Sequence, residues 1–164
     1  AKYGELVYNS TKANNEQKST SGFYLGKIAY DKADYNRAIN YFKTVIDNSD
    51  NVQTAEARYL HANSLYLQKN MTSAENATRN AINQNADHPY WLAKSMLLLS
   101  DIFADKNDLF NARAVLESLL ENYKEDAEIT RTAQTKLALI KRRQSSGNKL
   151  FQDTSRVNSF FDNN

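Results

Sequence analysis

Small residues recur along this chain at an almost constant spacing, and this repeat constrains the fold more than any other feature. Gly26 is followed by Ala62 after 36 residues, by Ser100 after a further 38, and by Ala138 after another 38. A second series has the same spacings, and its members are Ala38, Ala74 and Ala112. Small residues let the two helices of a hairpin approach closely, while large apolar residues fill the space between hairpins. One hairpin cannot bury its apolar face alone, so the repeat predicts a stack of hairpins.

The apolar residues within each unit follow the period of a helix. One run has the spacing i, i+1, i+4, i+7 and i+8, and it consists of Ala38, Ile39, Phe42, Val45 and Ile46. The 164 residues include only 4 Gly and 1 Pro, which favours helices over many short strands. The sequence therefore predicts an all-α fold, with helices over residues 15–32, 35–48, 53–69, 72–84, 89–106, 109–123 and 126–143.

Several helix starts have recognisable signals. Asp34 and Asp108 stand where the N-cap of a second helix is expected. Thr72 and Glu75 have the spacing of a capping box. Pro89 is tolerated in a first helical turn, and His88 before it is interpreted as a cap.

The chain divides into three parts on this reading. Residues 1–14 are expected to be the remnant of a preceding repeat, and residues 15–143 form three hairpins plus a capping helix. Residues 144–164 are polar and are predicted to form a flexible tail, although Phe151, Phe160 and Phe161 suggest that it packs on its own array or on a neighbouring chain. A chain that starts at Ala1 without Met is expected to be a piece of a longer protein or a processed form.

The composition argues against several classes of function. The net charge of +2, from 21 basic and 19 acidic residues, gives no bulk attraction to nucleic acid or to anionic membranes. No apolar run is long enough for direct membrane insertion. The lack of Cys excludes thiolate metal sites, and no phosphate-binding or metalloprotease motif occurs, so we expect no catalysis, metal or cofactor.

One histidine and one basic cluster are expected to have structural roles. His61 stands at a normally apolar helix position and is expected to be a buried or half-buried structural residue. One basic cluster is explained by favourable interaction with the dipole of a helix C-terminus, and it consists of Lys136, Lys141, Arg142 and Arg143.

The repeated pattern of small and apolar residues resembles a known family, the tetratricopeptide repeat. The resemblance is carried by Leu25, Gly26, Tyr30, Asp34, Tyr35, Ala38, Phe42 and Val45, and it covers about residues 15–143. It implies a right-handed superhelix of antiparallel helical hairpins, a TPR-like α-solenoid. The second unit departs from the family pattern at His61 and Thr78, and the usual Pro at the end of each unit is absent.

The unit length of 36 to 38 residues is similar to that of bacterial envelope members of the family. Examples are the lipoprotein of the outer-membrane assembly machinery and the coordinator linked to the Tol–Pal system. This similarity favours a periplasmic or outer-membrane-associated location over a cytoplasmic one.

The resemblance also implies a concave groove lined by the first helix of each hairpin. Carried onto this chain, the family's groove positions include Phe23, Lys27, Tyr30, Asp31, Tyr59, Asn63, Tyr66, Lys94, Asp101 and Asp105. Tyrosines offer a large contact area with a hydrogen-bonding tip, which suits reversible peptide binding, and the aspartates suit basic groups of a partner. Packing inside the array explains aromatic residues at helical spacing equally well.

The function that follows is a non-catalytic scaffold that binds a protein or peptide segment in the concave groove. The alternative is a structural assembly module that packs against other domains of a longer envelope protein or forms a homo-oligomer.

Overall fold

The computed structural model describes the backbone of residues 2–161 and the side chains of residues 2–146. All regular secondary structure in this part of the chain is helical. The helices are α1 (Lys2–Tyr8), α2 (Asn15–Asp31), α3 (Tyr35–Asn48), α4 (Val52–Leu67), α5 (Met71–Gln84), α6 (Pro89–Asp105), α7 (Leu109–Asn122) and α8 (Ala127–Phe161).

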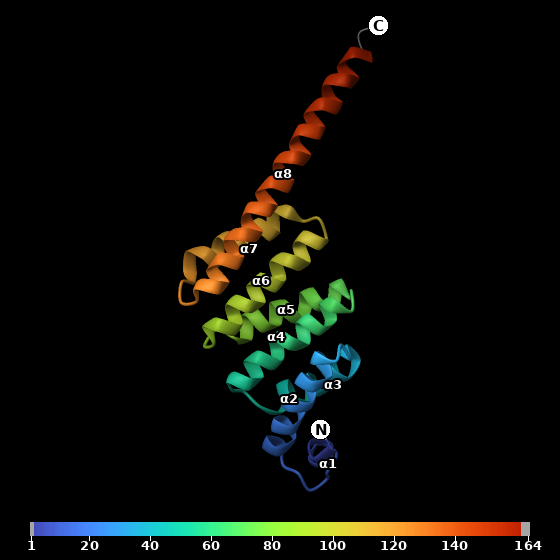
Figure 1. The fold of residues 1–164 in the computed structure, drawn as a ribbon, viewed down its shortest axis with the longest axis vertical. Coiled ribbons are helices and arrows are strands. Elements are labelled where there is room, and N and C mark those ends of the chain that lie inside the picture. Colours follow the sequence, from blue (N-terminus) through green and yellow to red (C-terminus); the bar gives the residue numbers. More distant parts are fainter. Residues whose placement is uncertain (1, 162–164) are drawn as a thin grey trace.

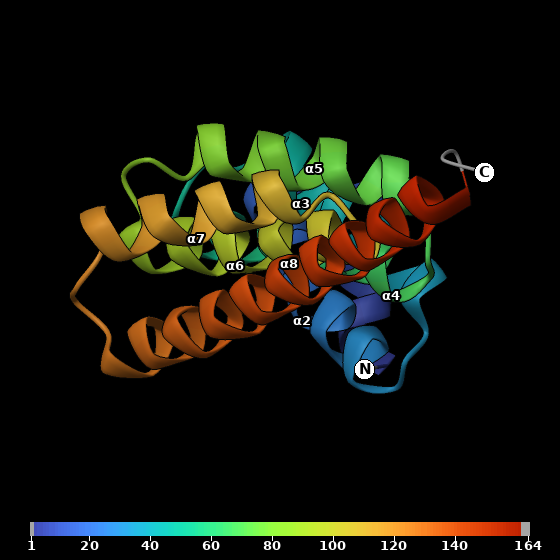
Figure 2. The same cartoon turned by 90° about the horizontal axis from the view of Figure 1, so that it is seen from above.

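The helices form a stack of antiparallel hairpins in two layers. The pairs α2–α3, α4–α5 and α6–α7 follow one another along the long axis, with α1 at one end and α8 at the other (Figure 1). Viewed along that axis, α3, α5 and α7 lie in one layer, and α2, α4, α6 and α8 lie in the other (Figure 2). The predicted all-α solenoid is therefore confirmed.

The turn inside each hairpin is the same three times. Ala33, Lys69 and Asn107 adopt positive φ angles of 58°, 63° and 59°. The next residue donates its amide to a carbonyl near the end of the first helix, as in Asp34 to Ala29 at 2.9 Å. This left-handed turn closes the helix and places an N-cap for the next one.

The predicted helix starts are partly correct. Asp34 and Asp108 cap α3 and α7, and Pro89 is the first residue of α6, as expected. The capping box at Thr72 is wrong, because α5 begins at Met71 and Asn70 accepts the hydrogen bond that caps it. His88 precedes α6 but its side chain makes no capping hydrogen bond.

The small residues lie where helices approach most closely. A Cβ atom on Gly26 would stand 2.6 Å from the nearest ring atom of Phe42, so only glycine fits there without movement of the ring. Ala38, Ala74 and Ala112 are fully buried between helices. Ala138 is the exception. It is exposed on α8, which within the described residues contacts only α6 and α7 of the preceding unit.

The helix α8 is longer than expected. The prediction that it ends near residue 143 is wrong, since its backbone continues as a helix to Phe161, beyond the last hairpin (Figure 1). The segment that follows residue 143 contains no Pro and one Gly, Gly147, so nothing in it breaks a helix. The predicted packing of Phe151, Phe160 and Phe161 concerns side chains outside the described residues, and the three-part division of the chain stays a prediction.

Candidate protein-binding face

The first helices of successive units are joined side by side through polar contacts. Asn63 of α4 donates to the hydroxyl of Tyr30 on α2 at 2.6 Å. The hydroxyl of Tyr66 on α4 donates to Asp105 of α6 at 2.8 Å. Lys136 of α8 donates to Asp101 of α6 at 2.5 Å, which continues the series to the end of the stack. These contacts hold the exposed sides of α2, α4, α6 and α8 in a fixed arrangement, which we call the first-helix face.

A pocket of about 160 Å³ lies on this face between α4, α6 and α8. Five of the ten predicted groove residues line it, and they are Tyr59, Asn63, Tyr66, Lys94 and Asp101. The buried side chains of Leu97 and Leu98 also line it, together with Thr132 and Lys136. The pocket is therefore apolar at its base and has polar groups at its rim.

The tyrosines of the pocket are half-buried and oriented by their neighbours. Tyr59 packs against Trp91 with ring centroids 5.7 Å apart, and the ammonium of Lys94 lies 5.3 Å from the centre of the Tyr59 ring. Burial raises the pKa of Tyr59 to about 12, so its hydroxyl stays protonated at neutral pH. Burial, the hydrogen bond to Asp105 and the charge of that carboxylate raise the pKa of Tyr66 further. Both hydroxyls are therefore neutral groups.

The acidic residue of the pocket is already paired. Burial raises the pKa of Asp101 above its ordinary value, while the hydrogen bond and charge of Lys136 act in the opposite direction. The ion pair leaves the side chains of Asp101 and Lys136 each about one-third exposed, at 33% and 30%. Asp101 is thus engaged inside the array rather than free to meet a basic partner group.

The other five predicted groove residues do not line the pocket. Phe23 is 4% exposed and packs in the core with Ala57 and Leu60 of α4, so the prediction that it faces a groove is wrong. Lys27 pairs with Glu56 at 2.7 Å, and Tyr30 is tied to Asn63. Asp31 is exposed at the end of α2, and Asp105 accepts the Tyr66 hydroxyl.

The role of Lys136 was not apparent from the sequence. The expectation that the basic cluster lies at a helix C-terminus is wrong, because α8 continues to Phe161 and places these residues in mid-helix, where the helix dipole has little effect. Lys136 follows Asp101 by 35 residues, close to the repeat length, and this spacing between opposite charges is the signal that indicates the pair.

The described residues contain neither a metal-binding cluster nor a membrane-spanning helix. Within the described residues, no group of three His, Asp or Glu side chains is arranged to hold a metal ion. Across the same residues, no helix is both long and apolar enough to span a membrane. His61 is partly buried, and burial lowers its pKa, as expected for a structural histidine.

Comparisons with known proteins agree with the repeat. Residues 90–126, which form α6 and α7, match the tetratricopeptide repeat family. The structure is similar to the crystal structure of BtubC (BKLC) from P. vanneervenii, with a TM-score of 0.64 and 13% sequence identity. That match covers 90% of this chain and 71% of the other, and at such low identity it supports the fold alone. A comparison with curated proteins finds no match.

Proposed function

We propose that this chain is a non-catalytic scaffold whose first-helix face binds a segment of a partner protein. Tetratricopeptide repeats generally mediate protein–protein interactions, and one hairpin of this chain matches that family. The proposal concerns where on the array the segment binds, and which residues it contacts.

One observation carries the proposal, namely the pocket between α4, α6 and α8. Its volume of about 160 Å³ suits a single large side chain of a partner. Buried leucines at its base favour an apolar group, and Tyr66 and Lys94 at its rim favour hydrogen bonds to the partner backbone. The hydrogen bond from Tyr66 to Asp105 and the contact of Lys94 with the Tyr59 ring hold these side chains in place before binding, which lowers the entropy cost of association.

The test begins with selection of peptides from a random dodecapeptide library on the immobilised protein. Enriched peptides are then titrated against Tyr66→Ala and Lys94→Ala by fluorescence anisotropy. We expect each change to weaken binding by about tenfold. Lys94→Ala should leave the melting temperature nearly unchanged, whereas Tyr66→Ala also removes the hydrogen bond to Asp105 and should lower it slightly. Equal loss of binding and of fold stability would show that these residues serve only to hold the array together.

Tyr24→Ala is the matched control. Tyr24 is 56% exposed on α2 and does not line the pocket. The same change of residue type there should leave peptide binding unaltered. Selection of no peptide, or equal weakening by Tyr24→Ala, contradicts the proposal.

Assembly with another protein surface is a second candidate, favoured by one feature of the stack. Tyr3, Leu6 and Val7 expose apolar side chains on α1 at one end of the array. Such a patch is typical of an interface. Sedimentation equilibrium of the chain and of Leu6→Glu tests this reading, which requires association that the charged variant abolishes. The unit length of 36 to 38 residues favours a location in a bacterial envelope.

A further inference from the structure

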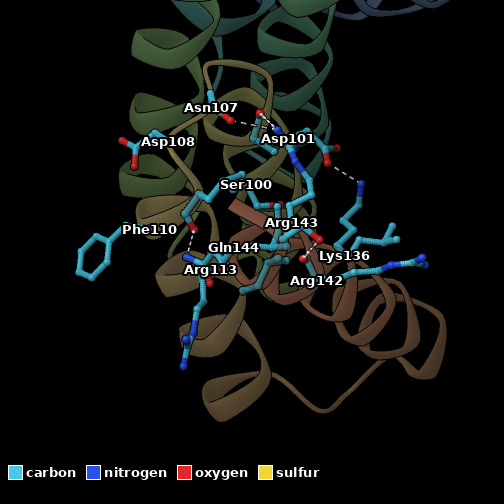
Figure 3. A pocket seen from close by; sticks show the side chains of 16 residues that line it. Ser100, Asp101, Asn107, Asp108, Phe110, Arg113, Lys136, Arg142, Arg143 and Gln144 are labelled. Atoms are coloured by element: carbon cyan, nitrogen blue, oxygen red, sulfur yellow. Dashed lines mark hydrogen bonds and ion pairs between the residues drawn. The ribbon is translucent and has the colours of Figure 1, made fainter. Parts of the chain in front are cut away.

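A second and larger hollow adjoins the pocket. It lies between α8 and the end of the α6–α7 hairpin and has a volume of about 1290 Å³ (Figure 3). We call it the α8 cleft. Helix α6 contributes Ser100, Asp101 and Ala104, and the turn and α7 contribute Asn107, Asp108, Leu109, Phe110, Arg113 and Leu116. Helix α8 contributes Lys136, Leu139, Ile140, Arg142, Arg143, Gln144 and Ser146.

The cleft is more basic than the molecule as a whole. Its charged residues are two acids, Asp101 and Asp108, and four bases, Arg113, Lys136, Arg142 and Arg143. The bases on α8 are not explained by a helix terminus, since the helix continues for many residues beyond them. Their positions on one side of α8 call for another explanation.

Most of these charges are already compensated within the chain. Lys136 pairs with Asp101, Arg113 pairs with Glu117, and Asp108 accepts hydrogen bonds from Asn111 at the start of α7. Arg142 and Arg143 are different. Among the side chains that the structure describes, no carboxylate pairs with either of them.

Arg143 is nevertheless held in place. Its guanidinium donates at 3.3 Å to the carbonyl of Ala104 and at 3.3 Å to the side chain of Asn107, so it crosses the cleft with a full charge and neutral partners (Figure 3). Arg142 extends on the same side of the cleft as Lys136, whereas Phe110 and Arg113 lie on the opposite side (Figure 3). Two guanidinium groups that have no carboxylate partner among the described side chains therefore stand beside the first-helix face.

The cleft adjoins the pocket. Asp101 and Lys136 line both hollows, and Leu139, 56% exposed, is the next residue of α8 along the same side. Lys136 and Arg143 are seven positions apart on α8, which corresponds to about 10 Å along the helix axis. An extended peptide covers this distance with about three residues.

We propose that the α8 cleft binds an acidic flank of the partner segment, with Arg142 and Arg143 pairing with its carboxylates. This inference rests on the proposed function, because the same segment fills the pocket. Leu139 contacts the segment between the two sites. The partner therefore carries Asp or Glu about three residues from the apolar side chain that enters the pocket.

The experiment uses the same random dodecapeptide library on the intact chain and on the Arg142→Gln/Arg143→Gln variant. We expect peptides selected on the unchanged protein to be enriched in Asp and Glu about three positions from an apolar or aromatic residue. The enrichment should disappear on the variant. The best peptide should bind the variant about tenfold more weakly, while its Glu→Gln form binds both proteins alike.

Two further variants control for fold and for net charge. Arg142→Gln alone keeps the contacts of Arg143, so a loss of binding in that variant does not arise from a disturbed turn. Arg131→Gln with Lys124→Gln changes the net charge equally at exposed positions outside the cleft, and it should leave peptide binding unchanged.

The outcomes separate the two proposals. Peptides that depend on Tyr66 but show no acidic preference, or keep it on the Arg142→Gln/Arg143→Gln variant, overturn this inference and leave the pocket proposal standing. Equal binding of a twelve-nucleotide single-stranded DNA with the same arginine dependence also overturns it, since the cleft is then a general anion site. Selection of no peptide overturns both.

Discussion

Gly26 and Ala138 occupy the same position of the repeat and have opposite surroundings. Gly26 lies against the ring of Phe42, with no room for a Cβ atom, whereas Ala138 is exposed to solvent. The difference arises because α3 packs against the side of α2 that carries Gly26, whereas α8 contacts only α6 and α7 within the described residues, and both belong to the preceding unit. The small residue is thus required because a neighbouring helix packs against it, and not by the helix that carries it.

A neighbouring position of the repeat differs between the helices in the same way. Ala29 of α2 and Phe103 of α6 are buried, but the corresponding residue of α8 is the exposed Lys141. Lys141 instead pairs with Glu117 of α7, with its ammonium 3.5 Å from the carboxylate. Whether a repeat position is apolar and buried therefore depends on the helices that pack against it.

The largest expected effect comes from removal of the ring that packs on Gly26. Phe42 is fully buried, so Phe42→Ala should lower the free energy of unfolding by about 3–5 kcal/mol through lost burial and a new cavity. Urea denaturation followed by circular dichroism measures this. Phe110→Ala removes the same ring from a 76% exposed site and should change stability by less than about 0.5 kcal/mol.

The next effect tests the comparison directly. Ala74→Leu should destabilise the chain by about 1–3 kcal/mol, because the added atoms meet a fully packed interface. Ala138→Leu should change stability by less than about 0.5 kcal/mol, since its surroundings are open. Equal unfolding midpoints for the two variants would show that the repeat register assigned here is incorrect.

A smaller effect distinguishes two paired carboxylates by their pH dependence. Hydrogen bonds and charge from Lys106 and Arg79 lower the pKa of Glu75 below 4.5. Its ionised form therefore stabilises the fold above that pH, and this stabilisation is lost as pH falls through the lowered pKa. Glu75→Gln should cost about 1 kcal/mol or less at pH 7 and nothing near pH 2, as measured by urea midpoints across pH.

The contribution of Asp101 to fold stability should change with pH in the opposite direction, and it should be the smallest of these effects. Burial raises its pKa above 3.8, so its contribution is greatest at pH values below 3.8 and decreases as pH rises through the raised pKa. The stability of the unchanged chain relative to Asp101→Asn should therefore fall over that range, by less than about 1 kcal/mol. A relative stability that rises with pH instead would indicate that Lys136 outweighs burial.

The sequence alone was sufficient for the periodic part of the molecule. Residue spacing predicted every hairpin helix to within two residues at each end, and Asp34 and Asp108 identified two caps. These features depend on local turns and on a residue pattern that recurs in each unit. The pattern of one unit therefore supports the interpretation of the next.

Only the tertiary structure decided which of the repeated positions are covered. Phe23 and Tyr66 both stand at family groove positions. Residues of α4 cover Phe23, whereas Tyr66 lies at the rim of a pocket. The length of α8 likewise decided that Lys136, Arg142 and Arg143 lie in mid-helix beside a cleft. Burial and charge compensation depend on neighbours about one repeat away in sequence, and a single helix contains no information on whether its neighbour is present.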